Sequence, residues 1–151
     1  MNTDQIKQAL APCGLSCGKC FAHVDGEIRR YSVKLREALG NFGIYAKRFE
    51  TLLDEPVFKN YPQFKTMLDY LAAENCRGCR NEQCKLFKEC GVRKCHQVKQ
   101  VDFCYQCEVF PCNKTNFDPA LHGAWVQINE KIRKIGIEQY AELTRSRSRY
   151  P

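Results

Sequence analysis

The densest cysteine stretch of this chain, residues 76–112, reads CRGCRNEQCKLFKECGVRKCHQVKQVDFCYQCEVFPC. An earlier stretch, residues 13–20, reads CGLSCGKC and holds the other three of the eleven cysteines. An odd number of cysteines leaves one unpaired in any disulfide framework, and thiols that stay reduced and close together bind metal ions. The cysteines therefore predict metal sites, and zinc is the metal we expect.

Three sets of cysteines have the spacing of ligand tripods. A Cys-x2-Cys pair lets a tight turn direct two sulfurs at one tetrahedral ion, and a third cysteine a few residues away completes the tripod. The three sets are Cys13, Cys17 and Cys20; Cys76, Cys79 and Cys84; and Cys104, Cys107 and Cys112. Cys90 and Cys95 remain as fourth ligands for two of the tripods. We therefore expect two or three zinc ions.

The second and third tripods share one spacing, because Cys76, Cys79 and Cys84 each have a counterpart 28 residues later. Two similar metal-binding loops would produce this internal repeat, and so would a chance match within a cysteine-rich stretch. The identical offset of all three positions favours two loops.

Three ions would leave one tripod a ligand short. His23 and His96 lie close to cysteines and are candidates for the missing ligand, whereas His122 lies on a predicted helix away from them. A structural zinc has four protein ligands, and a catalytic metal keeps one position open, so the sequence leaves an enzymatic role undecided. Two four-cysteine sites with three spare thiols are the other arrangement that the count allows.

Iron–sulfur chemistry is the alternative to zinc. Cys13, Cys17 and Cys20 match the Cys-x3-Cys-x2-Cys spacing of radical S-adenosylmethionine enzymes, but the sequence lacks the strands of their partial barrel. Lys19 also stands where that family usually has an aromatic residue. Thiolates bind iron–sulfur clusters as readily as zinc, so a cluster is not excluded by the ligands themselves.

The parts of the chain without cysteines have helical periodicity. Asp25 is placed to cap a helix and Gly40 to interrupt it, and three apolar stripes at helical spacing follow within residues 25–74. These stripes predict a helical core, and their members are Ile28, Tyr31, Leu35, Ala38, Leu39 and Phe42; Tyr45, Ala46, Phe49, Leu52 and Leu53; and Phe64, Met67, Leu68 and Leu71. We place Leu35, Phe49, Leu68 and Trp125 together in this core.

The end of the chain predicts further helices within residues 119–143. Asp118 and Pro119 form a strong helix start, and Gly136 divides the segment into two helices. The charged tail, residues 144–151, is expected to be mobile. Residues 1–151 are thus expected to form one domain that is mostly α, a small helical domain with irregular cysteine-rich metal-binding loops.

The formal net charge of +7 would suit a polyanionic partner, but it counts every cysteine as neutral. Eleven thiolates would remove eleven charges and three divalent ions would restore six, which leaves +2. Basic and aromatic residues alternate through residues 76–112, where we expect the cations to neutralise thiolates. Nucleic-acid binding is therefore possible but not favoured, and we expect it to be weak and carried by Lys131, Arg133, Lys134 and the arginines of the tail.

The cysteine motifs resemble those of an uncharacterised cysteine-rich family of bacteria and archaea. Its members open with Cys-Gly-Leu-x-Cys-x-x-Cys, as residues 13–20 do, and close with Cys-x-x-Cys-x-x-Phe/Tyr-Pro-Cys, as residues 104–112 do; residues 90–95, CGVRKC, also fit. The resemblance covers both cysteine blocks and little of the helical middle. It implies a metal-binding domain of unknown activity.

The sequence thus leaves three functional hypotheses. The favoured one is a zinc-binding interaction module, with another protein as its partner. The second is a small metalloenzyme or iron–sulfur protein with an open coordination position, and the third is a weak non-specific nucleic-acid binder. No apolar run approaches the ~20 residues of a membrane span, so we expect a cytoplasmic protein without membrane contact.

Overall fold

The computed structural model describes residues 1–81 and 84–150, and these residues form helices joined by loops. The α-helices are α1 (Thr3–Ala9), α2 (Glu27–Leu39), α3 (Phe42–Leu52), α4 (Tyr61–Ala72), α5 (Val92–Val98), α6 (Pro119–Ile135) and α7 (Ile137–Arg145). Short 3-10 helices lie at η1 (Pro56–Asn60), η2 (Cys79–Asn81) and η3 (Cys104–Gln106). The predicted mostly α fold class is confirmed. No helix in the described part of the chain is long and apolar enough to cross a membrane.

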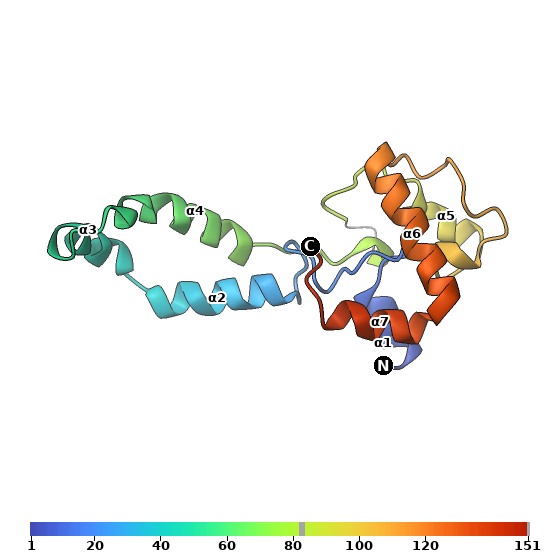
Figure 1. Cartoon of the computed structure of the whole chain (residues 1–151), viewed down its shortest axis with the longest axis horizontal. Coiled ribbons are helices and arrows are strands. Elements are labelled where there is room, and N and C mark those ends of the chain that lie inside the picture. The colour runs from blue at the N-terminus through green and yellow to red at the C-terminus, as the bar shows by residue number, and fades with distance from the viewer. Residues whose placement is uncertain (82–83, 151) are drawn as a thin grey trace.

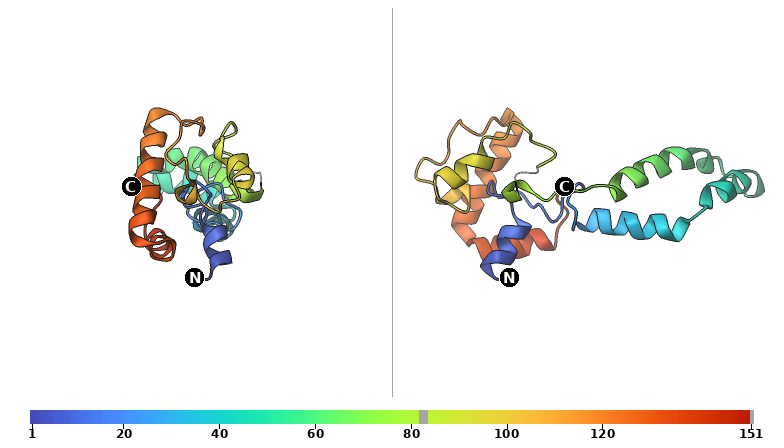
Figure 2. Two further views of the ribbon diagram at one scale, coloured as in Figure 1. Left: turned by 90° about the vertical axis from the view of Figure 1, so that its right-hand side faces the viewer. Right: turned by 180° about the vertical axis from the view of Figure 1, so that it is seen from behind.

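The molecule is elongated and has two parts, which we call the lobe and the arm. Figure 1 shows that the lobe contains α1, α5, α6, α7 and the loops around them, and that the arm contains α2, α3 and α4. Within the arm α2 and α4 run antiparallel and contact each other, and η1 packs on α3 at the far end. Both ends of the arm join the lobe at one place, as the view from behind in Figure 2 also shows.

The helix boundaries of the arm follow most of the predicted signals. Gly40 ends α2 with a φ of +47°, a conformation that glycine adopts more readily than other residues. Pro62 lies in the first turn of α4, where a missing N–H costs nothing. The predicted cap at Asp25 is wrong, because Gly26 is the capping residue and no side chain caps α2.

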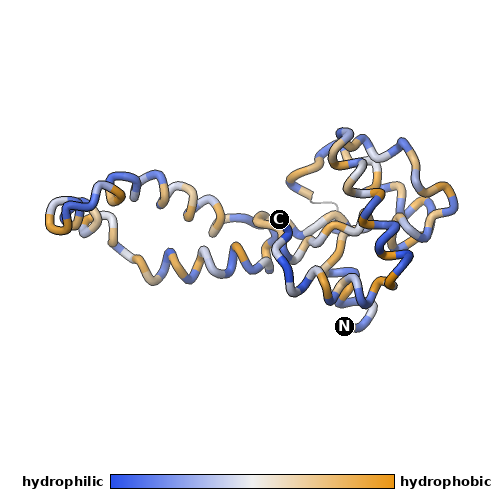
Figure 3. The backbone as a smooth tube through the Cα atoms, in the orientation of Figure 1, coloured by the Kyte–Doolittle hydropathy of each residue, from blue (hydrophilic) through white to orange (hydrophobic). Residues whose placement is uncertain are grey.

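The arm is not the buried core that its apolar stripes predicted. Only four of its described residues are buried: Ser32, Ala46, Leu68 and Ala72. Tyr31 and Leu35 are 58% and 44% exposed, and Figure 3 shows hydrophobic positions along the whole arm. The periodicity predicted the helices correctly, but a narrow helical hairpin has too few neighbouring elements to bury its apolar side chains. At the far end, aromatic rings pack in tilted pairs at centroid distances of 5.2 to 6.4 Å, among them Phe42, Phe49, Phe58 and Tyr61.

The core lies in the lobe, in two clusters. The first joins α1, α6 and α7 and consists of Ile6, Leu10, Phe103, Ile132, Tyr140 and Ala141. The second consists of Ala11, Cys13, Val92, Phe110 and Trp125, with six further cysteines packed around it. Trp125 therefore packs from α6 against the cysteine-bearing loops, and its predicted place in a core with Leu35, Phe49 and Leu68 is wrong.

Two helices of the lobe were missed from the sequence. α1 begins with a capping box in which Asn2 and Gln5 exchange hydrogen bonds, both of 2.9 Å. The Asn-x-x-Gln pattern before Ile6 was the available signal. α5 carries Cys95 and His96 inside a block that we expected to be irregular, and its seven residues are too few for a clear apolar period.

The last helices and the tail frame the cysteine loops. Asp118 caps α6 by accepting hydrogen bonds from the N–H groups of Ala120 and Leu121, and Gly136 separates α6 from α7, as predicted. The tail, which we expected to be mobile, makes contacts with the first cysteine block. Arg149 donates a hydrogen bond of 2.5 Å to the carbonyl of Ser16, and the hydroxyl of Tyr150 accepts one of 3.1 Å from the N–H of Phe21. Tyr150 is the residue that lets this charged segment pack.

The burial pattern of the arm predicts unequal effects of two leucine substitutions. Leu68→Ala removes a side chain that is only 5% exposed and should lower the free energy of unfolding by about 2–4 kcal/mol. Leu35→Ala removes one that is 44% exposed and should cost less than about 1 kcal/mol. Urea unfolding at low protein concentration, followed by circular dichroism, measures both. Equal losses would contradict the exposed position of Leu35.

Candidate metal centre

All eleven cysteines lie in the lobe, and all of them are free thiols. They line two cavities. One, the four-cysteine pocket, is lined by Cys95, Cys104, Cys107 and Cys112, and the other, the seven-cysteine cavity, is lined by Cys13, Cys17, Cys20, Cys76, Cys79, Cys84 and Cys90. Every predicted cysteine ligand therefore lies beside other cysteines.

The four-cysteine pocket has a volume of about 380 Å³. Its thiols interact electrostatically: burial and the charges of Cys112, Cys95 and Cys107 together raise the pKa of Cys104 to about 11. Cys95 comes from α5, and the other three come from the loop around η3. The three cysteines of the predicted tripod at residues 104–112 thus line one pocket together with Cys95.

Tight turns hold the loop of this pocket. The N–H of Cys107 donates to the carbonyl of Cys104 at 3.0 Å, and the N–H of Phe110 donates to the carbonyl of Cys107 at 3.1 Å. The Phe110 ring packs edge-on against Trp125 with 4.8 Å between centroids, which fixes the loop on α6. The Phe110–Pro111 peptide bond is cis.

Trp125 supplies a buried hydrogen-bond donor that favours a negatively charged sulfur in the four-cysteine pocket. Its indole N–H is buried and has no hydrogen-bond partner of normal geometry. The same group approaches the Cys104 thiol and lowers the pKa of that thiol against the effect of burial. A thiolate accepts a hydrogen bond better than a thiol does, so deprotonation of Cys104 would satisfy the buried donor.

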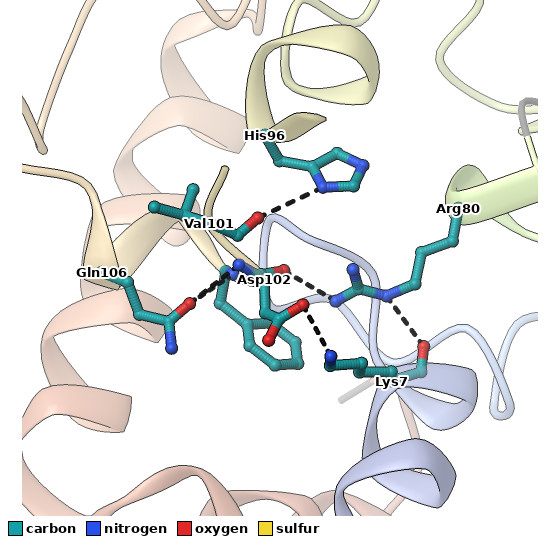
Figure 4. Close-up of polar contacts among 7 residues, drawn as sticks. Lys7, Arg80, His96, Val101, Asp102 and Gln106 are labelled. Atoms are coloured by element: carbon teal, nitrogen blue, oxygen red, sulfur yellow. Dashed lines mark hydrogen bonds and ion pairs between the residues drawn. The ribbon is translucent and has the colours of Figure 1, made fainter. Parts of the chain in front are cut away.

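His96 also lines the four-cysteine pocket. Its Nδ1 lies 3.3 Å from the carbonyl of Val101, which requires the proton on Nδ1, and its Nε2 is buried without a partner (Figure 4). Burial lowers the pKa of His96, so the ring is neutral at pH 7. A neutral imidazole whose Nδ1–H is held by a carbonyl is the usual form of a histidine ligand. His96 therefore has the protonation state that a metal ligand needs.

The seven-cysteine cavity has a volume of only about 30 Å³. Such a volume holds about two water-sized spheres, so it excludes an organic cofactor and admits metal ions. The cavity combines the two tripods predicted as separate sets, residues 13–20 and residues 76–84, and adds Cys90. Sequence proximity therefore does not separate the ligand sets of this cavity.

Cys79 connects the two blocks within the cavity. It shares hydrogen bonds with Cys17 and with Cys84. These bonds lower the pKa of Cys17 to about 7 and that of Cys84 to about 5, and they raise the pKa of Cys79 itself. The shared hydrogen bonds thus favour ionisation of Cys84 and Cys17 and keep the proton on Cys79 between them.

Backbone pairing places the two blocks side by side. The N–H of Cys76 donates to the carbonyl of Ala22, and the N–H of Val24 donates to the carbonyl of Cys76, both at 2.9 Å. The N–H of Gly78 lies 3.4 Å from the sulfur of Cys76, the kind of contact that stabilises a thiolate. The Cys-x2-Cys turns at residues 17–20 and 76–79 are thereby held next to each other.

His23 lines the same cavity but has the opposite tautomer to His96. The N–H of Asp25 donates to Nδ1 of His23 at 3.2 Å, so in the neutral ring the proton is on Nε2. Burial lowers the pKa of His23, which keeps the ring neutral. An Nε2–H group donates hydrogen bonds and does not coordinate metal. His23 therefore suits a donor to a thiolate better than the ligand role that we considered from the sequence.

The first cysteine loop is anchored on α6. Gly14 has a φ of +88°, and a Cβ there would lie 2.5 Å from Cγ2 of Ile128, so only glycine allows this close approach. The fully buried side chain of Asn129 donates hydrogen bonds to the carbonyls of Cys13 and Trp125, both at 2.9 Å. Asn129 was not identified from the sequence, where it is one polar residue of an amphipathic helix.

Arginines surround the seven-cysteine cavity. Arg80 donates to the carbonyls of Lys7 and Asp102 at 3.0 and 2.7 Å, as Figure 4 shows, and its charge acts on Cys17, Cys13 and Cys79. Arg93 donates to the carbonyl of Phe87 at 2.7 Å and acts on Cys84 and Cys90. Arg149 acts on Cys17. Within the cysteine blocks, Arg80 and Arg93 thus act on thiols as we expected, whereas Lys85 pairs with Glu74.

Coordination would require the thiols to draw closer together. Across residues 1–81 and 84–150, no three histidine, cysteine, aspartate or glutamate side chains form a ready-made ligand group. The thiols instead contact one another as hydrogen-bonding groups. The ligand sets proposed below rest on their convergence, their charge environment and the donors around them.

Comparison with known proteins gives one match. Residues 9–117, which include all eleven cysteines and the whole arm, match a protein-family model described as "Protein of unknown function (DUF3795)". The match extends through the helical middle that the motif resemblance left out. No curated protein and no solved structure matches the chain.

The thiol environments predict how alkylation depends on pH in the metal-free, reduced protein. The rate at Cys84, whose pKa is about 5, should be nearly constant between pH 6 and 8, whereas the rate at Cys104, whose pKa is about 11, should rise about tenfold per pH unit. Peptide mass spectrometry after pulses of iodoacetamide measures both rates. In guanidinium chloride the two should behave alike, and the same behaviour without denaturant would contradict the assigned environments.

Proposed function

The chain belongs to the DUF3795 family of proteins of unknown function, and we propose that it is a zinc-binding interaction module. In this proposal bound zinc holds the loops of the lobe, and the arm presents an apolar face to another protein chain. The metal-binding part is supported by the cysteines, and the interaction part is supported by the exposure of the arm. We treat the two in turn.

The convergence of four thiols in the four-cysteine pocket carries the metal-binding proposal. Four cysteines from two segments interact electrostatically around Cys104, which is the full ligand set of a structural zinc site. The buried N–H of Trp125 supplies the kind of outer hydrogen bond that such sites use. Zinc would fix α5 to the loop of residues 104–112 and to α6 behind it. His96 is the one alternative donor in this pocket.

The dimensions of the seven-cysteine cavity favour zinc over an iron–sulfur cube. A cube of four irons and four sulfides contains eight heavy atoms, whereas a cavity of about 30 Å³ holds about two water-sized spheres. Bare ions fit this space with less movement of the chain. An iron–sulfur cluster in this cavity is the alternative that metal analysis would identify.

The apolar face of the arm supports the interaction role. On α2, Leu35 and Tyr31 lie about 60° and 100° around the helix from the buried Ser32. On α4, Phe64 and Met67 lie about 40° and 100° from the buried Leu68 in the same rotational sense. Because α2 and α4 are antiparallel, equal rotations move both pairs to the same side of the hairpin. The four side chains Tyr31, Leu35, Phe64 and Met67, which we call the arm face, are 44% to 60% exposed.

A second copy of this chain is the occupant that we propose for the arm face. Two antiparallel helices with apolar residues on one side form half of a four-helix bundle, and an identical hairpin supplies the other half. An isologous contact uses the same face on both chains, so it requires no second complementary surface. An amphipathic helix from a different protein would use the same face.

A catalytic role has one structural feature in its favour. A groove of about 980 Å³, lined by Cys17, Cys79, His23 and Arg77 among others, lies beside the seven-cysteine cavity. A metal ion with an open position there would be accessible to a small ligand. A cobalt-substituted protein whose spectrum changes on addition of azide would favour this second candidate, and an unchanged spectrum would remove it.

The nucleic-acid hypothesis loses its main cations. Arg133 donates to the carbonyl of Tyr105 at 2.9 Å and lies 4.8 Å over the Phe110 ring. Arg149 is held by the carbonyl of Ser16, and Arg145 pairs with Glu142 at 3.6 Å. Three of the six terminal cations that we expected to bind phosphate thus have partners within the lobe, which weakens this hypothesis.

Metal analysis tests the central proposal. Protein purified without added metal should carry at least two equivalents of zinc per chain by mass spectrometry of the native state and by elemental analysis. Cys104→Ser should remove one equivalent, because it deletes a ligand of the four-cysteine pocket. The matched variant Cys20→Ser should leave that pocket loaded. Protein without tightly bound metal would refute the proposal, and iron with sulfide would change it to a cluster protein.

The arm face predicts self-association. Sedimentation equilibrium should show a concentration-dependent dimer, and Leu35→Glu combined with Met67→Glu should make the chain monomeric by placing charges in the apolar contact. The control pair Lys34→Glu and Thr66→Glu adds charge outside the face and should leave the dimer intact. A wild-type chain that remains monomeric at high concentration would assign the face to a different protein.

A further inference from the structure

The number of cysteines in the second cavity is one fewer than two separate zinc ions need. Two tetrahedral ions have eight ligand positions, and seven cysteines line this cavity. His23 has the tautomer of a hydrogen-bond donor, which makes it a poor eighth ligand. Two ions in this cavity would therefore need one ligand that serves both, whereas a single ion would leave three thiols unused.

We propose that the seven-cysteine cavity holds a binuclear zinc–thiolate cluster in which the sulfur of Cys79 bridges the two ions. A bridging thiolate fills two coordination positions, so seven cysteines satisfy two tetrahedral ions. Together with the four-cysteine pocket, the chain would bind three ions with eleven cysteines and no histidine. This inference rests on the proposed zinc-binding function and assigns the ligands within it.

Cys79 occupies the central position that a bridge requires. Its thiol shares hydrogen bonds with Cys17 on one side and with Cys84 on the other. Cys17 belongs to the first cysteine block, and Cys84 follows Cys79 in the second. A metal ion that replaced each shared proton would be bound by Cys79 and one of these neighbours.

The ligands of the first ion are two facing Cys-x2-Cys turns. Cys17 and Cys20 form one turn, in which the N–H of Cys20 donates to the carbonyl of Cys17 at 2.9 Å. Cys76 and Cys79 form the other, and the hydrogen bonds between Cys76 and the backbone of the first block hold the two turns together. Paired turns of this kind are a common way to build a four-cysteine zinc site.

The ligands of the second ion are the remaining thiols and the bridge. Cys84, Cys90 and Cys13 complete its set with Cys79. Cys13, Cys84 and Cys90 line the same cavity as Cys79. The charge of Cys84 acts on Cys90, and the charges of Cys17, Cys104 and Cys90 act on Cys13. Burial raises the pKa of Cys13 and of Cys90, and a divalent ion would offset the cost of burying their thiolates.

The surrounding charges match those of the proposed cluster. Seven thiolates with two divalent ions have a net charge of −3, and three guanidinium groups act on these cysteines: those of Arg80, Arg93 and Arg149. Each of the three is also held in place by at least one backbone carbonyl. Fixed cations around a buried anionic cluster supply the compensation that such a site requires.

Cadmium-113 NMR of the full chain tests the bridge. Protein reconstituted with three equivalents of cadmium-113 should give three resonances, of which two are split by cadmium–cadmium coupling through the shared sulfur and one is unsplit. Cys107→Ser should remove the unsplit resonance only. Three unsplit resonances, or a single ion in the seven-cysteine cavity, would overturn the bridge.

Two variants separate the bridge from an ordinary ligand. Cys79→Ser should abolish the splitting and weaken both ions of the pair, whereas Cys20→Ser should weaken one of them, as measured by competition with a chromophoric chelator. Loss of only one ion in Cys79→Ser would overturn the bridge. If Cys79→Ser does not fold, the splitting in the wild-type spectrum remains the deciding measurement. Zinc content without splitting would refute the bridge alone, whereas absence of bound metal would refute the proposed function as well.

Discussion

Repulsion between closely packed thiolates is the constraint on which the lobe depends. Eleven cysteines lie around two cavities, and their negative charges oppose one another wherever they ionise. Guanidinium groups held by carbonyls offset this repulsion with positive charge, and backbone N–H groups and the indole N–H of Trp125 offset it as hydrogen-bond donors to sulfur. These groups come from the loops, the tail and α6.

Much of the fold could be predicted from the sequence, because helix signals are local. Asp118, Gly40 and Gly136 act through their own backbone or near neighbours, and their effects were predicted correctly. Whether a side chain is buried depends instead on elements that are distant in the sequence. Leu35 belongs to an apolar stripe with regular helical spacing and is still 44% exposed, because no other element that the structure describes packs on that side of the hairpin. The spacing alone does not reveal which elements lie beside a helix.

The cysteine sites show the same division. The three cysteines of residues 104–112 are close along the chain and line one pocket, and Cys95 reaches the same pocket from α5. The tripods at residues 13–20 and 76–84 were separated by the same reasoning, although Cys17 and Cys79 touch across more than sixty residues of chain. Spacing finds turns that present sulfur, and only the tertiary fold decides which turns face each other. Histidine tautomers likewise depend on contacts, as Asp25 and Val101 show.

The arm leaves and re-enters the lobe at one neck, where Ala22 and Cys76 are hydrogen-bonded. It is therefore a closed loop of more than fifty residues whose ends are fastened beside cysteines. Closing a flexible loop of about 50 residues costs roughly 3–4 kcal/mol of chain entropy by the logarithmic rule. Contacts that hold the two ends together at the neck offset this entropic cost of closing the loop. The conformational freedom of the arm's two ends therefore depends on the segments that carry Cys20 and Cys76, and any change that loosens these segments would also loosen the hairpin.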